Sequence, residues 1–108
     1  MNHSVTSISV QDLKQQMNES DICLVDVREM DEWEEVHIPE AIHIPLGQLE
    51  ECVHLLPNKK DQPIFLHCRG GKRSLRGGEQ LLALGYQNVY SIEGGIVAWI
   101  AAGYPIQD

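Results

Sequence analysis

The segment 67–74, His-Cys-Arg-Gly-Gly-Lys-Arg-Ser, holds the residues best suited to chemistry in this sequence. Cys68 supplies a nucleophilic sulfur, but a free thiol has a pKa of about 8.5 and is mostly protonated at neutral pH. Two neighbouring features should favour the thiolate. Arg69, Lys72 and Arg73 bring positive charge, and the N-terminus of the helix expected after the loop presents unpaired N–H groups. We therefore expect Cys68 to be a reactive nucleophile.

The two glycines of this loop serve a different purpose. Gly70 and Gly71 have no Cβ, so they can adopt positive φ and turn backbone N–H groups inward to form an anion-binding nest. Arg73 could orient an oxyanion through two parallel hydrogen bonds. The residues expected to bind a small anionic substrate are Arg69, Gly70, Gly71, Lys72, Arg73 and Ser74.

The other cysteines and the histidines fit a catalytic role less well. Cys23 lies in an apolar run and Cys52 lies beside acidic residues, so both are interpreted as structural. His67 precedes Cys68 on a strand, where successive side chains point to opposite faces, so a direct Cys–His pair is not expected. His37 and His43 form no metal-ligand pattern. We expect neither a metal nor a cofactor.

Charge and composition restrict the function classes. The 108 residues carry a formal net charge of −8, which argues against a nucleic-acid partner because phosphate contacts need basic surface. Half of the eight Lys and Arg nevertheless fall within 69–76, which indicates either a site for a small anion or a solvated basic helix face. No apolar run reaches the roughly 20 residues of a membrane span, and 1–10 does not resemble a secretory signal. A cytoplasmic protein without membrane contact is expected.

Strand-like and helical segments alternate along the chain. Strands are expected over 8–10, 22–27, 41–44, 64–67 and 88–92, and helices over 10–18, 31–36, 46–56, 74–84 and 96–102. This alternation predicts an α/β fold with a mainly parallel sheet covered on both faces. Ligands in such sheets bind at the carboxyl ends of strands, and Cys68 follows the strand at 64–67.

Four motifs follow one another along the chain. They are Leu24-Val25-Asp26-Val27-Arg28-Glu29; His37-Ile38-Pro39 with Ala41-Ile42-His43-Ile44-Pro45; the loop Cys68 to Ser74; and Asn88-Val89-Tyr90 with Glu93-Gly94-Gly95 and Ala98-Trp99. In this order they resemble the rhodanese family of sulfurtransferases. The motifs cover about residues 22–105, and 1–108 is expected to form a single rhodanese domain.

The resemblance implies a three-layer α/β/α fold with a five-stranded sheet. It also implies that Cys68 takes a sulfur atom from thiosulfate or another sulfane donor as a persulfide and passes it to an acceptor, cyanide in the assay. A small anionic sulfur donor and a sulfur-acceptor protein are the implied partners. Asp26 and Arg28 match the family's Asp-x-Arg and are expected to pair as structural support.

The spacing within the loop separates related activities. Four residues lie between Cys68 and Arg73, whereas the related phosphatases have five, in a wider loop that fits a tetrahedral phosphate. The shorter loop favours sulfur transfer over a phosphatase or an arsenate reductase. A rhodanese-like module that binds a partner without turnover is the other alternative, but it would not require the intact cysteine loop.

Overall fold

The computed structural model describes residues 4–108, and a five-stranded sheet forms its centre. The strands are β1 (Thr6–Ile8), β2 (Cys23–Asp26), β3 (Ile42–His43), β4 (Ile64–His67) and β5 (Val89–Ile92). Their order across the sheet is β1-β5-β4-β2-β3, and all four neighbouring pairs are parallel. The predicted α/β fold with a five-stranded, mainly parallel sheet is confirmed.

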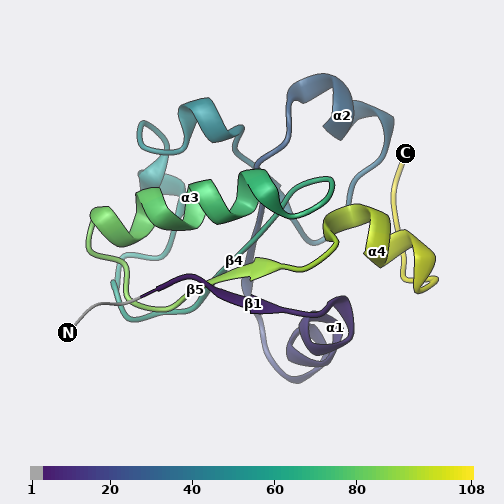
Figure 1. The fold of residues 1–108 in the computed structure, drawn as a ribbon, viewed down its shortest axis with the longest axis horizontal. Coiled ribbons are helices and arrows are strands. Elements are labelled where there is room, and N and C mark those ends of the chain that lie inside the picture. The colour runs from purple at the N-terminus through teal and green to yellow at the C-terminus, as the bar shows by residue number, and fades with distance from the viewer. Residues whose placement is uncertain (1–3) are drawn as a thin grey trace.

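Helices cover both faces of this sheet. They are α1 (Val10–Glu19), α2 (Met30–Glu35), α3 (Lys72–Ala83) and α4 (Gly95–Ala101), with two 3₁₀ turns, η1 (Leu46–Gln48) and η2 (Val53–Leu55). In Figure 1, α3 runs along one side of the strands and α1 lies on the other. Because each face has its own helical cover, the fold has three layers.

Two apolar cores follow from the alternation of side chains along the strands. On β4, Ile64 and Leu66 enter the core under α3 and the 3₁₀ turns, while Phe65 enters the core that contains Trp99. Both faces of β4 are therefore buried, which is why its sequence is a continuous apolar run. Trp99 is 1% exposed and belongs to this second core.

The first helix begins as its sequence predicts. The Ser9 side chain accepts a hydrogen bond from the Asp12 amide at 3.0 Å and caps α1. The strand before it ends at Ile8 rather than Val10, because Ser9 and Val10 already belong to the cap and the first turn.

Two sequence predictions about helices were wrong in detail. The expected helix over 46–56 is replaced by η1 and η2, and Cys52 caps the second of these turns instead of lying within a helix. The helix after the cysteine loop begins at Lys72, not at 74, so the last part of the expected loop is already helical. Leu75 and Leu84, at the two ends of the helix expected over 74–84, are 39% and 41% exposed.

Gly77 and Gly78 are buried in the middle of α3, where glycine weakens a helix. Their role is close packing. A Cβ on Gly77 would lie 3.2 Å from the Leu49 side chain, and a Cβ on Gly78 would lie 2.6 Å from Val5. The two glycines therefore let α3 lie close to η1 on one side and to the start of β1 on the other.

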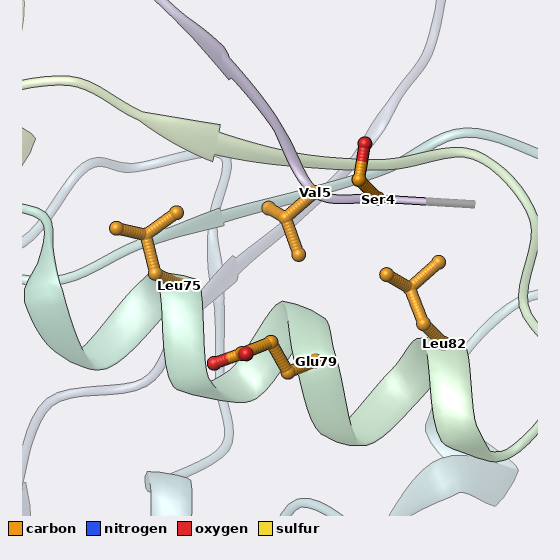
Figure 2. A pocket seen from close by; sticks show the side chains of 5 residues that line it. All are labelled: Ser4, Val5, Leu75, Glu79 and Leu82. Atoms are coloured by element: carbon orange, nitrogen blue, oxygen red, sulfur yellow. The ribbon is translucent and has the colours of Figure 1, made fainter. Parts of the chain in front are cut away.

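A groove of about 500 Å³ runs beside this contact and is lined by Ser4, Val5, Leu75, Glu79 and Leu82. Figure 2 shows Val5 above α3, between Leu75 and Leu82. This groove explains how Leu75 stays partly exposed. None of the residues of the cysteine loop lines it, so it is separate from the candidate active site.

No helix among residues 4–108 has both the length and the apolar character needed to cross a lipid bilayer.

Candidate active site

Cys68 lies at a topological switch point of the sheet. It follows β4, and the neighbouring strand β2 ends at the same edge with Asp26 paired to His67. The chain continues from β4 to β5 on one side and from β2 to β3 on the other. Ligands of open parallel sheets bind in the crevice that forms where connections diverge in this way.

The loop after β4 brings a backbone amide to the cysteine sulfur. The Gly71 N–H donates to Cys68 Sγ with an N···S distance of 3.0 Å. Gly71 has a φ of 118°, a conformation that only glycine adopts readily, and it caps α3. The inward direction of the Gly71 amide agrees with the predicted anion nest, and anion binding by the loop stays a prediction. Gly70, which could also adopt positive φ, does not do so in the structure.

Two opposing effects set the pKa of Cys68. Burial raises it, because a thiolate is poorly solvated inside the protein. Hydrogen bonds from the backbone and hydroxyl of Ser74 and from the backbone amides of Gly71 and Arg73 lower it, and together they outweigh burial. The net pKa lies below the ordinary value of a thiol. The first turn of α3, rather than the charges of the basic side chains, supplies the main stabilisation.

Ser74 connects the sulfur to the neighbouring strand. Its hydroxyl lies 3.7 Å from Cys68 Sγ, 3.0 Å from the carbonyl oxygen of Gly71 and 2.6 Å from the hydroxyl of Ser91 on β5. Ser74 is fully buried and Ser91 is 2% exposed. The two hydroxyls form a short polar chain that ends at the sulfur.

The N-terminus of α4 holds the outer side of the loop. The amides of Ile96 and Val97 donate to the carbonyl oxygens of Cys68 and Arg69 at 2.9 and 3.3 Å. This approach depends on Gly95, which has a φ of 53°, because a Cβ there would overlap both carbonyl oxygens. Since the N–H of a trans peptide points away from its C=O, these bonds turn the Arg69 and Gly70 amides away from α4.

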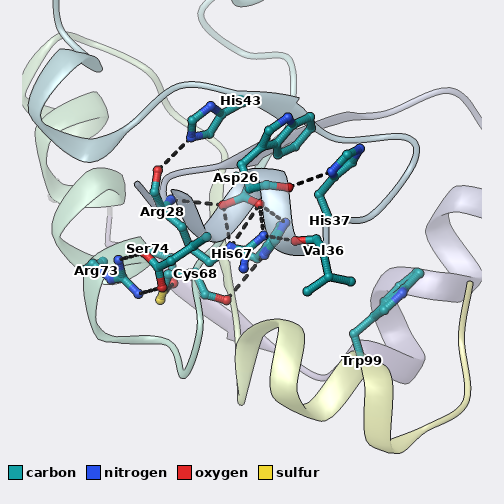
Figure 3. Close-up of polar contacts among 12 residues, drawn as sticks. Asp26, Arg28, Val36, His37, His43, His67, Cys68, Arg73, Ser74 and Trp99 are labelled. Carbon is teal, nitrogen blue, oxygen red and sulfur yellow. Dashed lines mark hydrogen bonds and ion pairs between the residues drawn. The ribbon is translucent and has the colours of Figure 1, made fainter. Parts of the chain in front are cut away.

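Arg73 is engaged by a carboxylate. Its two terminal nitrogens pair with the two carboxylate oxygens of Glu32 on α2, at 2.6 and 3.0 Å (Figure 3). The hydrogen bond from Arg73 lowers the pKa of Glu32 to about 2. The edge of the guanidinium that was expected to grip an oxyanion is therefore occupied. Arg73 ties the loop to α2, and its part in substrate binding stays a prediction.

Arg69, Lys72 and Gly70 lie on the exposed side of the loop. No hydrogen bond or ion pair of the Arg69 or Lys72 side chain is recorded among residues 4–108. These cations are available to attract an anion in solution. Their assignment to substrate binding stays a prediction.

Asp26 and Arg28 form a buried ion pair beneath the loop. The shortest contact joins Arg28 Nη2 to Asp26 Oδ2 at 2.7 Å, and the same nitrogen donates to the Val36 carbonyl at 2.6 Å. Both side chains are almost fully buried. The arrangement links the end of β2 to the end of α2, as expected of structural support.

His67 packs beside this ion pair and not against the sulfur. Its Nδ1 lies 3.3 Å from the carbonyl oxygen of Cys68, an atom that can only accept, and its Nε2 lies 3.6 Å from Asp26 Oδ2. Burial lowers the pKa of His67, so the ring is neutral at neutral pH. The expectation that His67 and Cys68 do not form a direct catalytic pair agrees with this geometry.

His37, His43, Cys23 and Cys52 lie outside the loop. Trp33 stacks between His37 and His43, with ring centroids 3.8 and 5.0 Å away. Cys23 and Cys52 pack against the core under α3, and burial raises the pKa of Cys23. Within residues 4–108, no group of three or more His, Cys, Asp or Glu side chains is placed to hold a metal ion.

A model of the rhodanese-like domain matches residues 9–102. The chain belongs to the rhodanese family. Its relatives include a sulfurtransferase of Allochromatium vinosum, 33% identical, with 94% of each chain covered. A thiosulfate sulfurtransferase GlpE of Coxiella burnetii is 34% identical over 82% of this chain and 79% of the relative. These relatives support a sulfurtransferase-type activity.

The fold agrees with solved rhodanese structures. A rhodanese-related protein from Thermoplasma volcanium superposes with a TM-score of 0.81 at 34% identity, covering 94% of this chain and 97% of that one. The chain also spans about half, 51%, of a longer Bacillus subtilis relative, YrkF, at 33% identity.

Three residues that support the cysteine loop in the structure of this rhodanese were missed in the sequence. Glu32 is one of several acids within 29–35, and nothing local distinguishes the one that reaches Arg73. Gly95 was recognised only as part of the motif Glu93-Gly94-Gly95. Ser91 offered a usable signal, because a hydroxyl in the middle of a buried apolar strand needs a hydrogen-bond partner.

Proposed function

We propose that this rhodanese transfers a sulfane sulfur from thiosulfate to a thiophilic acceptor through a persulfide on Cys68. The observation that carries the proposal is the 3.0 Å hydrogen bond from the Gly71 amide to Cys68 Sγ, at the start of α3. Backbone N–H groups that point at a sulfur atom stabilise negative charge on it, and both a thiolate and a persulfide anion carry such a charge.

In the first half-reaction, the Cys68 thiolate attacks the outer sulfur of thiosulfate. A new S–S bond forms to Cys68, the S–S bond of thiosulfate breaks, and its electron pair leaves with sulfite. The cations Arg69 and Lys72 favour approach of the dianionic donor. The product is a Cys68 persulfide anion.

In the second half-reaction, an acceptor such as cyanide attacks the outer sulfur of that persulfide. A C–S bond forms, the S–S bond breaks, and its electron pair returns to Cys68 as the thiolate while thiocyanate leaves. No net oxidation of the enzyme occurs over the cycle. Covalent catalysis of this kind gives ping-pong kinetics.

The position of Arg73 favours sulfur transfer over phosphate hydrolysis. A phosphatase needs a guanidinium that grips the phosphate oxygens through two parallel hydrogen bonds. Here both terminal nitrogens of Arg73 bind Glu32, and only four residues separate Arg73 from Cys68. A single sulfur atom on the cysteine needs no such grip.

The proposal includes a protein as a sulfur acceptor. A groove of about 220 Å³ lies between α2 and α4, and Arg69 of the loop lines it. Val97 and Ile100 on its α4 side are 52% and 44% exposed. An acceptor that covered this apolar rim would bring its own nucleophile close to the loop.

A cytoplasmic location is also part of the proposal, and the three free cysteines support it.

The test measures thiocyanate formation from thiosulfate and cyanide by the wild type and by Cys68→Ser, with Cys52→Ser as the matched control. We expect turnover in the wild type and the control and none in Cys68→Ser. Donor treatment without acceptor should add about 32 Da to the wild type, the mass of one sulfur on the thiolate. A wild type with neither turnover nor this mass increase would be a partner-binding module. Hydrolysis of an aryl phosphate that depends on Cys68 would support the phosphatase alternative instead.

A further inference from the structure

A pair of buried serine hydroxyls lies behind the cysteine sulfur. Ser91 belongs to β5 and Ser74 to the first turn of α3, and their oxygens are 2.6 Å apart. Neither sequence motifs nor the proposed reaction use Ser91. Ser91 is 2% exposed and lies between apolar residues. A buried hydroxyl of this kind needs a hydrogen-bond partner, because an unpaired one would destabilise the folded protein.

The protons of the two hydroxyls can be assigned by counting donors and acceptors. Each hydroxyl has one proton, whereas the Gly71 carbonyl can only accept. If Ser74 donated to Ser91, the Gly71 carbonyl would keep the Leu75 amide as a donor, but the proton of Ser91 would have no acceptor within hydrogen-bond distance among residues 4–108. If Ser91 donates to Ser74, both protons are used. Buried polar groups are nearly always paired, so the second arrangement holds.

We propose that Ser91 is a positioning residue for Cys68: by donating to Ser74, it directs the Ser74 proton towards the loop and the sulfur. In the thiol state, the Cys68 S–H donates to the Ser74 oxygen and Ser74 donates to Gly71, whose carbonyl is 3.0 Å away. In the thiolate state, the S–H donor is gone, and the Ser74 proton can turn to the anion 3.7 Å away.

Ser91 matters most in the thiolate state. Without it, the thiol state still supplies the Ser74 oxygen with a donor, namely the S–H of Cys68. The thiolate state then leaves that buried oxygen with no donor, which costs free energy in this state alone. A hydroxyl that accepts a hydrogen bond is also a stronger donor, so Ser91 strengthens the bond from Ser74 to the anion. Removing Ser91 therefore disfavours the charged sulfur.

The inference rests on the proposed function only in taking Cys68 as the nucleophile, and its test does not depend on sulfur transfer. The full chain is alkylated with iodoacetamide between pH 5 and pH 10, and modification of Cys68 is followed by mass spectrometry of its peptide. We expect the midpoint of the rate profile of Ser91→Ala to lie about one pH unit above that of the wild type, or about 1.4 kcal/mol. An unchanged midpoint overturns the inference.

A double-mutant cycle tests whether Ser91 acts through Ser74. In a Ser74→Ala background, Ser91→Ala should shift the midpoint by less than about 0.3 unit, because the intermediate hydroxyl is absent. A shift of the full size in that background overturns the inference.

The matched pair Ser91→Thr and Ser91→Val provides a second measurement if Ser91→Ala does not fold. The two side chains have nearly the same shape and differ in a hydroxyl. The threonine variant should keep the wild-type midpoint and the valine variant should not, and equal midpoints contradict the inference. If the variants show the expected shifts but the wild type forms no thiocyanate, the proposed function is refuted and this inference stands.

Discussion

Gly95 provides the most direct test of how α4 holds the cysteine loop. Replacing it with alanine places a Cβ where the carbonyl oxygens of Cys68 and Arg69 lie. These are backbone atoms, so neither can rotate away as a side chain could. The loop and α4 must separate, and the hydrogen bonds from Ile96 and Val97 to the loop are lost or lengthened.

The expected cost of Gly95→Ala has two parts. An alanine in the left-handed region, which Gly95 occupies at a φ of 53°, costs roughly 1–2 kcal/mol. Losing two backbone hydrogen bonds adds about 0.5–1.5 kcal/mol each. We therefore expect Gly95→Ala to lower the free energy of unfolding by about 3 kcal/mol, a large share of the stability of a small domain.

Gly103→Ala is the matched control. Gly103 also has positive φ, 79°, but no atom lies within 4 Å of the position its Cβ would take. This variant should lose only the conformational part, about 1–2 kcal/mol. Urea unfolding followed by circular dichroism measures both variants.

Cys68 reactivity supplies a second readout. Because the loop carries the Gly71 amide that binds the sulfur, iodoacetamide should alkylate Cys68 more slowly at pH 7 in Gly95→Ala, and at the wild-type rate in Gly103→Ala. If the two variants unfold within about 0.5 kcal/mol of each other and react equally fast, α4 does not hold the loop as argued.

Two further predictions concern the inner side of the loop. Gly71→Ala should slow alkylation of Cys68 by about tenfold at pH 7, as a rise of one pKa unit does, because alanine does not readily adopt a φ of 118°. The control Gly70→Ala, with no atom within 4 Å of its Cβ, should react like the wild type. Equal alkylation rates in the two variants would contradict this prediction. Glu32→Gln should destabilise the protein by about 1 kcal/mol at pH 7, a value reduced for partial exposure. The pKa of Glu32 is depressed to about 2 in the folded protein, so its stabilising effect is complete above the ordinary carboxyl pKa and is lost as pH falls through about 2. Urea unfolding from pH 7 to pH 2 should show the difference from wild type shrinking below about pH 4.5, while a difference independent of pH would exclude the ion pair as its cause; Glu34→Gln on the same helix is the control.

Local sequence was informative where local chemistry decides the structure. The apolar run at 64–67 predicted β4, and the helix expected over 10–18 is α1, which begins at Val10. The same kind of signal failed over 46–56, where leucines at helical spacing pack as two 3₁₀ turns. Spacing identifies residues that share a face, but it does not decide whether the backbone between them completes a helix.

The sequence by itself determined the fold class and the family resemblance, and it singled out Cys68 among three cysteines as the candidate nucleophile, because each depends on neighbours in the chain. Tertiary structure decided what surrounds the sulfur. Arg73 meets Glu32 from a position 41 residues away, and Ser74 meets Ser91 across 17 residues. Gly95 meets the Cys68 carbonyl because α4 begins beside the loop. Contacts of this kind depend on how the strands are ordered in the sheet, and local sequence patterns carry no distances between them.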